Sequence, residues 1–469
     1  MVKASLPKFL ERIYKMIDTI SAIATPAGEG GLCVIRLSGE NSLTITEKIF
    51  FLSNGKRFQE RKARYVYFGK IVDPKTKRPV DEVILTYFKA PKSYTCEDVV
   101  EITAHGGTYV ASRILQVTLD NGARLAEPGE FTKRAFLNGR LDLSQAEAVS
   151  DVISAASESA LQSALGQLQG KLSVKISELY ERLVATLAQL ETAIDFPEEG
   201  LEVDQRKHLQ KEISSIVNEL IKLADTWRQG KIKREGVRAV LIGKPNVGKS
   251  SLLNALLKEE RAIVTPHPGT TRDLLEERIC IKDIHVVFVD SAGLRSNPEP
   301  VEVEGIARAL SALEQADLAL LLFDGSQNLD ESDFKLICSA REKPFIAIVN
   351  KFDLSEKWDL ERLPIDRRKV FRISAKTGTG VPALLEAIHK IAIKMTPDAL
   401  VIASERHRYQ LMQASSALNK TLQSFREKLS EEFIAADIQQ GLNHLGMILG
   451  KTFEDDLLDK IFQEFCIGK

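Results

Sequence analysis

The segment Gly243-Lys244-Pro245-Asn246-Val247-Gly248-Lys249-Ser250 decides the fold of the central part of this chain. It follows the apolar run VRAVLI and precedes SLLNALL, which has helical spacing. A G-x-x-x-x-G-K-[ST] pattern between a strand and a helix is a phosphate-binding loop. Its backbone N–H groups surround the β-phosphate, the Lys249 ammonium reaches the β- and γ-phosphates, and the Ser250 hydroxyl suits Mg²⁺. The pattern predicts a nucleoside triphosphate site.

Three later segments complete this prediction. Asp290-Ser291-Ala292-Gly293 follows the apolar run HVVFV, where a carboxylate can hold Mg²⁺ through water and a glycine N–H can meet the γ-phosphate. Asn350-Lys351-Phe352-Asp353 follows FIAIV, and Asp353 can accept hydrogen bonds from guanine N1–H and its exocyclic amine, which adenine lacks. Ser374-Ala375-Lys376 would close the base pocket. Gly269 to Asp273, the sequence GTTRD, lies where a switch loop could bring Thr271 to Mg²⁺.

The residue that orients the attacking water is less obvious. Leu294 follows Gly293, where Ras-like enzymes carry a glutamine, and an apolar side chain cannot position water. Arg295, Glu302 and Glu304 are candidates along the chain. Spacing alone does not choose among them.

The length of the chain and the succession of strand-like and helix-like segments predict several domains. Its 469 residues correspond to about three domains, and 44% hydrophobic with 28% charged residues is an ordinary globular composition. Short β-rich runs up to about residue 138 indicate an α+β domain. Alternating strands and helices over 233–396 predict a doubly wound α/β domain inserted between two helical segments, 139–232 and 397–469.

The first helical segment is expected to contain one long helix. Ten apolar residues from Leu161 to Ile194 recur at steps of three and four without an intervening proline. At 1.5 Å per residue this helix would span roughly 51 Å. A second helix is expected over 203–227.

The charge, the hydropathy and the cysteine content limit the classes of protein to which this chain can belong. Lys and Arg number 64 against 65 Asp and Glu, so the net charge neither proves nor excludes RNA binding. No apolar stretch approaches the roughly 20 residues of a membrane span, and the N-terminal residues lack a secretory signal. Five cysteines, widely spaced, form neither a disulfide framework nor a zinc site. We expect a cytoplasmic protein without a membrane segment.

These motifs, together with the segment PGEFTKRAFLNGRLDLSQAEAVSDVI and the final CIGK, resemble the MnmE family of tRNA-modifying GTPases over residues 18 to 469. The resemblance implies a multidomain fold: an N-terminal α+β folate-binding and dimerisation domain (1–138), a discontinuous α-helical domain (139–232 and 397–469) and an inserted α/β P-loop G domain (233–396). It also implies GTP hydrolysis as a homodimer. With the flavoprotein MnmG, which carries the FAD, members install an aminomethyl or carboxymethylaminomethyl group at C5 of the tRNA wobble uridine. The one-carbon unit comes from a tetrahydrofolate derivative, 5-formyl- or 5,10-methylene-tetrahydrofolate.

The resemblance also assigns residues. Folate contacts are expected from Arg36, Glu101, Arg140 and Lys469, although many relatives have Lys at position 140. Magnesium ligands are Ser250 and Thr271, and K⁺, which replaces an arginine finger, meets Asn246, Thr265, His267 and Thr270. Glu302 matches the water-positioning glutamate and acts with Lys249 in catalysis. The full expected GTP set is Asn246, Val247, Gly248, Lys249, Ser250, Ser251, Thr265, Thr270, Thr271, Asp290, Ser291, Ala292, Gly293, Asn350, Lys351, Asp353, Ser374, Ala375 and Lys376.

Two positions depart from the usual pattern. Ser291 replaces a threonine, and Cys96 replaces a common glycine, which puts the local turn in doubt. Cys466 lies in the tail that should approach the folate pocket, where inert packing and chemical reactivity are both open.

Two other functions would explain parts of this sequence. A regulatory or ribosome-assembly GTPase of the Era-like class would explain the G domain but not the folate-like N-terminus or the tail. An independent folate enzyme with a regulatory G domain would form product without the flavoprotein.

Overall fold

The computed structural model describes residues 18–54, 58, 62–196, 203–259, 276–290, 312–354, 357, 365–396, 400–453, 455–463 and 465–469. The chain forms two compact units. The first contains the described residues of Met1–Ser150, Gln167–Arg182 and Leu442–Lys469, and the second those of Asp151–Gly166 and Leu183–Gly441.

The first unit is built on a seven-stranded sheet of order β3-β4-β5-β6-β2-β1-β7. Neighbouring strands are antiparallel except β1 and β7, which are parallel. The strands are β1 (Ile20–Ile23), β2 (Leu32–Ser38), β3 (Phe50–Leu52), β4 (Val66–Val72), β5 (Pro79–Phe88), β6 (Val99–His105) and β7 (Arg124–Leu125).

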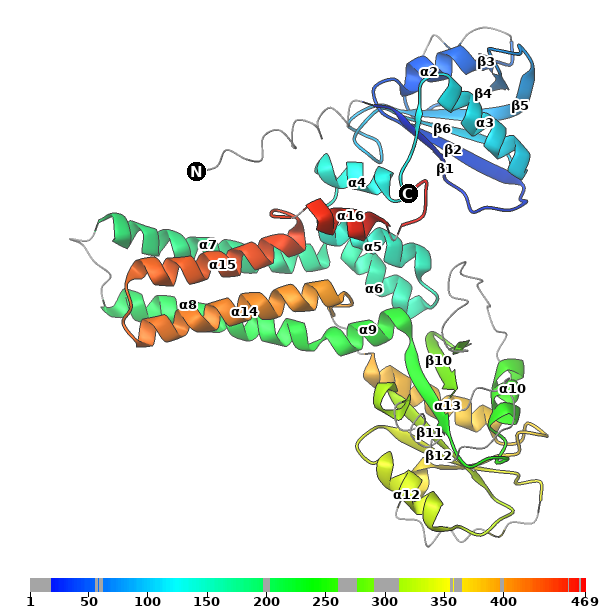
Figure 1. The fold of residues 1–469 in the computed structure, drawn as a ribbon, viewed down its shortest axis with the longest axis vertical. Helices are drawn as coiled ribbons and strands as arrows, with labels where there is room; N and C mark the ends of the chain where they lie inside the picture. Colours follow the sequence, from blue (N-terminus) through cyan, green and yellow to red (C-terminus); the bar gives the residue numbers. More distant parts are fainter. Residues whose placement is uncertain are drawn as a thin grey trace. The chain divides into compact units, whose positions relative to one another are not determined.

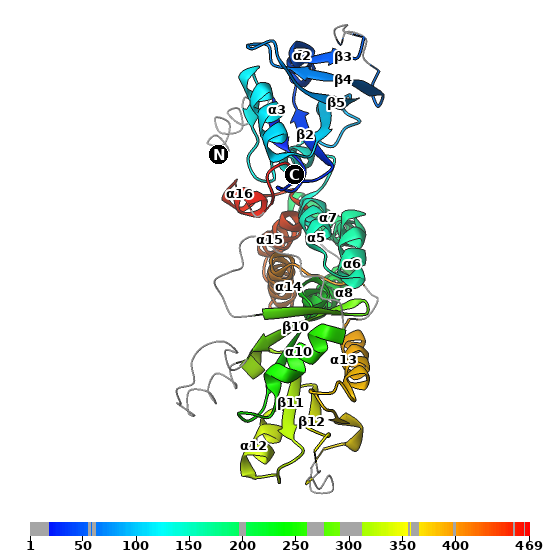
Figure 2. The ribbon, with the colours of Figure 1, turned by 90° about the vertical axis from the view of Figure 1, so that its right-hand side faces the viewer.

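Alternation along the strands divides this sheet into two different faces. In β2 the buried Cys33, Ile35 and Leu37 join the core, and helices α2 (Ser42–Ile49) and α3 (Thr108–Asp120) pack on this sheet (Figures 1 and 2). Arg36, between them in sequence, points to the opposite face because successive side chains alternate. That face therefore carries the polar groups expected to bind ligand.

The C-terminal residues complete the first unit. Helices α4 (Glu130–Leu137) and α16 (Asp455–Gln463) pack together with the start of α5 (Leu143–Ser154). Their shared core contains Phe136, Leu143, Leu458 and Phe462. Beyond α16, Ile467 forms a backbone bridge with Pro128. The tail is thus part of the unit that the first 150 residues begin.

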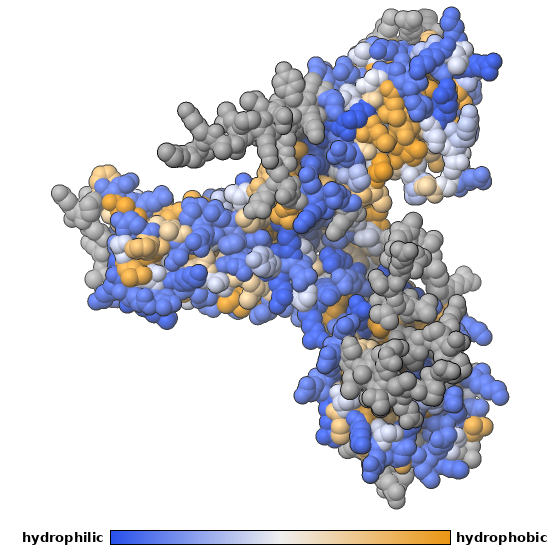
Figure 3. All heavy atoms as spheres, viewed as in Figure 1, coloured by the Kyte–Doolittle hydropathy of each residue, from blue (hydrophilic) through white to orange (hydrophobic). Residues whose placement is uncertain are grey.

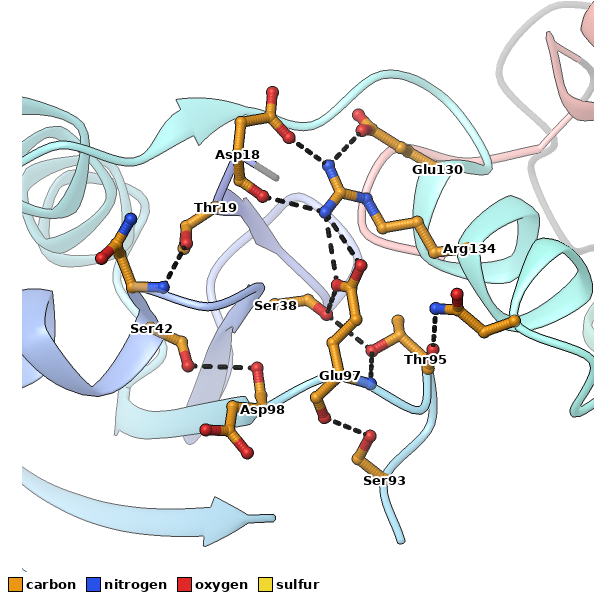
Figure 4. Close-up of polar contacts among 12 residues, drawn as sticks. Asp18, Thr19, Ser38, Ser42, Ser93, Thr95, Glu97, Asp98, Glu130 and Arg134 are labelled. Atoms are coloured by element: carbon orange, nitrogen blue, oxygen red, sulfur yellow. Dashed lines mark hydrogen bonds and ion pairs between the residues drawn. The ribbon is translucent and has the colours of Figure 1, made fainter. Parts of the chain in front are cut away.

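A buried cluster of charges holds this unit together around Arg134 (Figure 4). Arg134, 3% exposed, pairs with Asp18 at 2.6 Å, Glu130 at 2.9 Å and Glu97 at 3.3 Å. Arg124 contacts Asp18 and Glu130 as well, each at 2.6 Å. Although burial opposes charge on these carboxyls, the arginines outweigh it and hold the pKa of Asp18 and of Glu130 below their ordinary values. One cation therefore links the start of β1, the loop before β6 and helix α4.

The prediction of a single helix over 161–194 is wrong. The structure has α6 (Glu158–Leu168) and α7 (Lys171–Asp195), separated at Gly170, whose φ is +85°. Glycine adopts this left-handed conformation readily and ends helices for that reason. The Gln145 side chain donates to the Leu168 carbonyl at 2.9 Å and so satisfies a helix-end acceptor. The apolar spacing continued across a break that it could not reveal.

The second unit combines helices with an α/β domain. Its helices include α8 (Val203–Asp225), α9 (Trp227–Glu235) and α14 (Glu405–Arg426), while α7 and α15 (Glu431–Leu449) each have residues in both units. Helices α8 and α14 lie side by side along their lengths (Figure 1). The expected helix over 203–227 corresponds to α8, which ends two residues earlier. Among the described residues no helix is long and apolar enough to cross a membrane.

The α/β domain contains a six-stranded sheet of order β13-β12-β11-β8-β10-β9, parallel except for β9. Its elements are β8 (Val237–Ile242), α10 (Lys249–Glu259), β9 (Glu276–Ile281), β10 (Ile284–Asp290), β11 (Leu318–Asp324), α12 (Glu331–Ser339), β12 (Phe345–Asn350), η2 (Arg367–Lys369), β13 (Val370–Arg372) and α13 (Val381–Met395). Strands β11 and β12 are buried throughout, as parallel strands covered on both faces must be. The predicted fold class, α+β, helical and α/β P-loop parts in one chain, is confirmed.

Replacing Arg134 with methionine should destabilise the first unit by about 3 to 5 kcal/mol, because three carboxylates would lose their buried partner. Urea unfolding at pH 7 measures this. Lys133→Met is the matched control on the same helix, since Lys133 pairs with the half-exposed Asp459 and such pairs contribute at most about 1 kcal/mol. Equal effects of the two substitutions would contradict a stabilising role for the cluster.

The difference in stability between the natural protein and Arg134→Met should depend on pH. The folded-state pKa values of Asp18 and Glu130 lie below the ordinary 3.8 and 4.5, so the stability that they contribute is complete above those ordinary values. It is lost as the pH falls below them through the folded-state values. The difference between the natural protein and Arg134→Met should therefore shrink below about pH 4.

Candidate functional site

The phosphate-binding loop joins the end of β8 to the start of α10. Helix α10 begins at Lys249, so its free N–H groups face the loop, where an anion is favoured. Asn246 and Gly248 have φ of +61° and +99°, and asparagine and glycine tolerate this region best. A Cβ atom on Gly248 would lie 2.3 Å from Asn350 Nδ2. Only glycine permits this approach.

The buried amide of Asn350 ties this loop to the predicted base-binding segments. Asn350 is 3% exposed. Its Nδ2 donates to the Val247 carbonyl at 2.8 Å, and its Oδ1 accepts from the Ala375 N–H at 2.9 Å. Three segments that lie far apart in sequence therefore meet at the carboxyl ends of the strands, where α/β sheets bind ligands.

The carboxylate of Asp353 is held beside Ser374. The Ser374 hydroxyl donates to Asp353 Oδ1 at 2.7 Å, and this hydrogen bond holds the pKa of Asp353 below its ordinary value. Lys351 pairs with Asp324 at the end of β11, at 2.6 Å. Burial opposes the charge of Asp324, but the bond to Lys351 outweighs it and lowers the pKa of Asp324. Asp353 is thus an ionised acceptor at neutral pH.

Two lysines of the phosphate-binding loop have different partners. Lys249 Nζ donates to the carbonyls of Gly243 at 2.7 Å and Lys244 at 2.9 Å, which keeps its ammonium at the loop. Lys244 Nζ lies 2.6 Å from both Asp330 and Asp333 at the start of α12. These carboxylates outweigh the effect of burial and raise the pKa of Lys244. Lys244 thus fastens the loop to α12.

Several predicted residues lie outside the described part of the chain. They are Thr265, His267, Thr270, Thr271, Ser291, Ala292, Gly293 and Glu302, together with Arg295 and Glu304. Asp290 ends β10, although only its backbone is described. Ser250, Ser251 and Lys376 are described and exposed to solvent.

In the first unit the structure brings together three of the four predicted folate residues. Arg36 Nε donates to Glu101 Oε1 at 2.9 Å across the β2–β6 pair, and Arg36 Nη1 donates to the Gly468 carbonyl at 3.4 Å. The Phe131 N–H donates to the carbonyl oxygen of Lys469 at 3.2 Å. Arg36, Glu101 and the backbone of the tail therefore lie together on the face of the sheet opposite α2 and α3.

Arg140 joins this group through Tyr94. The Arg140 guanidinium lies 4.7 Å from the centre of the Tyr94 ring, and that of Arg36 lies 5.6 Å from it. Arg140 Nη1 also donates to the Tyr94 carbonyl at 2.7 Å. Tyr94 OH is hydrogen-bonded to Thr132 at 2.8 Å, which fixes the ring. Tyr94 was not among the residues predicted from the sequence. Its position in a loop, next to a turn, is the one feature of the sequence that could have indicated a role in binding.

The turn beside this aromatic residue contains Cys96. Its φ is +61°, a left-handed conformation in which a residue with a Cβ is strained. The doubt raised by a cysteine at a position usually held by glycine is thus explained: the backbone keeps the conformation that glycine favours. Cys466 is exposed, and its carbonyl accepts from the Gly129 N–H at 3.4 Å.

Family models match nearly the whole described chain. Residues 19–140 match the model described as GTP-binding protein TrmE N-terminus, and residues 143–466 match the MnmE helical domain.

Curated relatives match over the full length. A tRNA modification GTPase MnmE from Natranaerobius thermophilus is 43% identical over 96% of this chain and 99% of its own. Proteins of the same name from Alkaliphilus oremlandii and Clostridioides difficile are each 42% identical over 96% of this chain and 99% of theirs. The solved G domain of the T. maritima FeoB iron transporter is 30% identical, covering 33% of this chain and 98% of that one, with a TM-score of 0.24.

Replacing Asn350 with alanine should lower the free energy of unfolding of the α/β domain by about 3 kcal/mol, because the buried Val247 carbonyl and the half-buried Ala375 N–H would both lose their partner. Thermal and urea unfolding without nucleotide measure this. Asn254→Ala, an exposed change on α10, is the control and should alter stability by less than about 0.5 kcal/mol. An unchanged Asn350→Ala protein would show that the amide does not join the segments.

Proposed function

Because the chain belongs to the MnmE family of tRNA modification GTPases, we propose that it hydrolyses GTP to drive modification of the tRNA wobble uridine. Acting with the flavoprotein MnmG, it would help install an aminomethyl or carboxymethylaminomethyl group at C5. The carbon would come from 5-formyl- or 5,10-methylene-tetrahydrofolate, and FAD would belong to the partner. Because tRNA is the proposed substrate, we place the reaction in the cytoplasm.

The observation that carries the GTPase proposal is the Asn350 bridge between the phosphate-binding loop and the base-binding segments. It sets Asp353 at a fixed place relative to the loop. An ionised carboxylate there accepts from two adjacent guanine donors, while adenine offers an acceptor at N1. Together these features support selection of GTP over ATP.

The donor types of the loop support the proposed metal ions. Ser250 presents an exposed hydroxyl at the first turn of α10, and oxygen ligands suit Mg²⁺. Asn246, exposed and left-handed, offers an amide oxygen suited to K⁺. When bound, K⁺ would supply positive charge beside the β- and γ-phosphates, as an arginine finger does. Glu302 is proposed to orient the attacking water, with Thr265, His267, Thr270 and Thr271 completing the two ion sites.

The charge pattern on the face of the first sheet that carries Arg36 and Glu101 supports folate binding. A pterin carries N–H donors that match a carboxylate such as Glu101, and a glutamyl tail carries anions that match guanidinium groups. Arg36 is held between this carboxylate and the tail carbonyl of Gly468. Gly468 has φ of +97°, and a Cβ there would lie 2.3 Å from the Ile23 carbonyl oxygen. A tail that fits so closely supports a role for Lys469 in the site.

The same sheet also supports a homodimer. Val66, Phe68 and Ile84 are 59%, 54% and 43% exposed, and Phe68 and Ile84 are paired across β4 and β5. Apolar surface (orange) is visible over the first unit in Figure 3. Exposed apolar side chains grouped on a sheet are typical of an interface. We propose that a second copy of the chain covers them.

The flanking segments argue against an assembly GTPase of the Era-like class. An Era-like protein would share only its G domain with the MnmE family. In this chain the segments on both sides of the G domain also match the family models. An independent folate enzyme would form product without MnmG, which a reconstituted assay with and without the flavoprotein decides.

Asp353→Asn should lower GTP affinity by roughly 100-fold, because a neutral amide presents an N–H group where two guanine donors need an acceptor. Affinity for xanthosine triphosphate should rise, since xanthine has a carbonyl in place of the exocyclic amine. Fluorescence titration with both nucleotides measures this. Asp366→Asn, at an exposed ion pair with Arg368, is the control. Unchanged base preference in Asp353→Asn would exclude the assigned role.

GTP turnover with Mg²⁺ should be much faster in K⁺ than in matched Na⁺ buffer, and Asn246→Ala should remove this difference. Glu302→Ala should slow turnover in both salts with less effect on GTP binding. Asn254→Ala serves as the control for an exposed asparagine in the same domain. Equal, slow turnover in both salts by the natural protein would contradict potassium activation and favour an external activator.

A further inference from the structure

We propose that the open pocket beside Tyr94 is a subsite for the γ-linked polyglutamyl chain of the folate, and that Arg64 and Lys92 make the protein prefer polyglutamylated folates. This inference rests on the proposed folate binding. It adds two residues that sequence reasoning did not select, and it names the form of the substrate.

The pocket has a one-sided charge. It encloses about 600 Å³ and opens to solvent. Among the described residues, the charged ones that line it are Arg64, Lys92 and Arg140, and none is a carboxylate. The remaining lining residues are Phe88, Pro91, Ser93, Tyr94, Cys96, Asn138 and Gly139. A pocket whose described lining carries three cations favours a ligand with several negative charges.

These cations are available to a ligand. Within the described chain none of the three forms an ion pair. The two arginines donate to main-chain carbonyl oxygens, Arg64 Nη2 to that of Lys92 at 3.2 Å and Arg140 Nη1 to that of Tyr94 at 2.7 Å. Nearby carboxylates have other partners. Glu97 pairs with Arg134, Asp98 accepts from Tyr87, and Glu101 pairs with Arg36. The positive charge of the pocket is therefore not neutralised by its described surroundings.

Tyr94 gives the direction of the ligand. Its ring contacts Arg36, which holds the pterin-matching Glu101, and also Arg140, which lines the pocket. A folate has its pterin at one end and its glutamates at the other. With the pterin near Glu101, a molecule passing Tyr94 would direct its glutamates toward Arg140, Lys92 and Arg64. This continuity favours a polyglutamyl chain over an RNA backbone as the occupant.

Binding of tetrahydrofolate with one, three and five glutamates should be measured by titration calorimetry on the full chain. We expect the natural protein to bind the triglutamate about three- to tenfold more tightly than the monoglutamate, which is the effect of two further exposed ion pairs. The double substitution Arg64→Gln and Lys92→Gln should abolish this gain while leaving monoglutamate affinity nearly unchanged. Lys48→Gln, an exposed cation on α2 outside the pocket, should retain the gain.

The outcomes separate the two proposals. Monoglutamate binding without any effect of chain length would overturn the subsite and leave folate binding intact. Failure of every folate to bind would overturn both. Loss of the gain in Lys48→Gln would show a general charge effect and overturn the subsite. Weaker tRNA binding by the double variant, with the chain-length gain unchanged, would assign the pocket to RNA instead.

Discussion

The nucleotide domain depends on the contact between the Asn350 amide and the phosphate-binding loop. This amide can reach the Val247 carbonyl only because Gly248 has no Cβ, and it reaches Ala375 only because β12 and β13 end at the same edge of the sheet. The parallel order of the strands, the glycine and the asparagine are therefore a single requirement. The same bond that completes the fold also fixes the distance between the phosphate-binding loop and the segments proposed to bind the base, so one residue serves both stability and the proposed nucleotide selection.

In the first unit a buried charged side chain, rather than an amide, joins separate segments of the chain. Arg134 joins Asp18, Glu97 and Glu130, which belong to three separate segments. Glu97 also accepts from Ser38, which is hydrogen-bonded to Thr95, so the loop that carries Tyr94 is fixed from beneath. A buried cation of this kind is costly to desolvate and gives stability only when all its partners are present. It defines the positions of the loop and of α4, and through them the geometry around Arg36 and Arg140.

Sequence reasoning succeeded where the signal is local. The strand, loop and helix around Lys249 and the residues after β12 are short continuous patterns. The elements form as expected, the Asn350 amide bonds to the Val247 carbonyl, and Asp353 accepts from Ser374. It failed at Gly170, where apolar spacing continues through a helix end, because spacing carries no information on φ. It also missed Lys244 with Asp330 and Asp333, and Tyr94 with Arg36. These pairs join residues far apart in sequence, and nothing in either segment alone indicates its partner. The switch-loop residues and Glu302 lie outside the described chain, so their assignments stay predictions.

The bridge between Pro128 and Ile467 has a consequence for how the protein is made. The first unit needs residues 442–469 for its core and its tail contacts, and these are synthesised long after residues 18–150. The segment 183–441 is synthesised before them and belongs to the other unit. While it emerges, the N-terminal sheet must wait without α16, with the apolar surface around Phe136 uncovered. The first unit is therefore begun early in synthesis but can be completed only after the second unit has been made. Contacts between residues so far apart in sequence form slowly. Truncation near the C-terminus would harm a domain that was translated first.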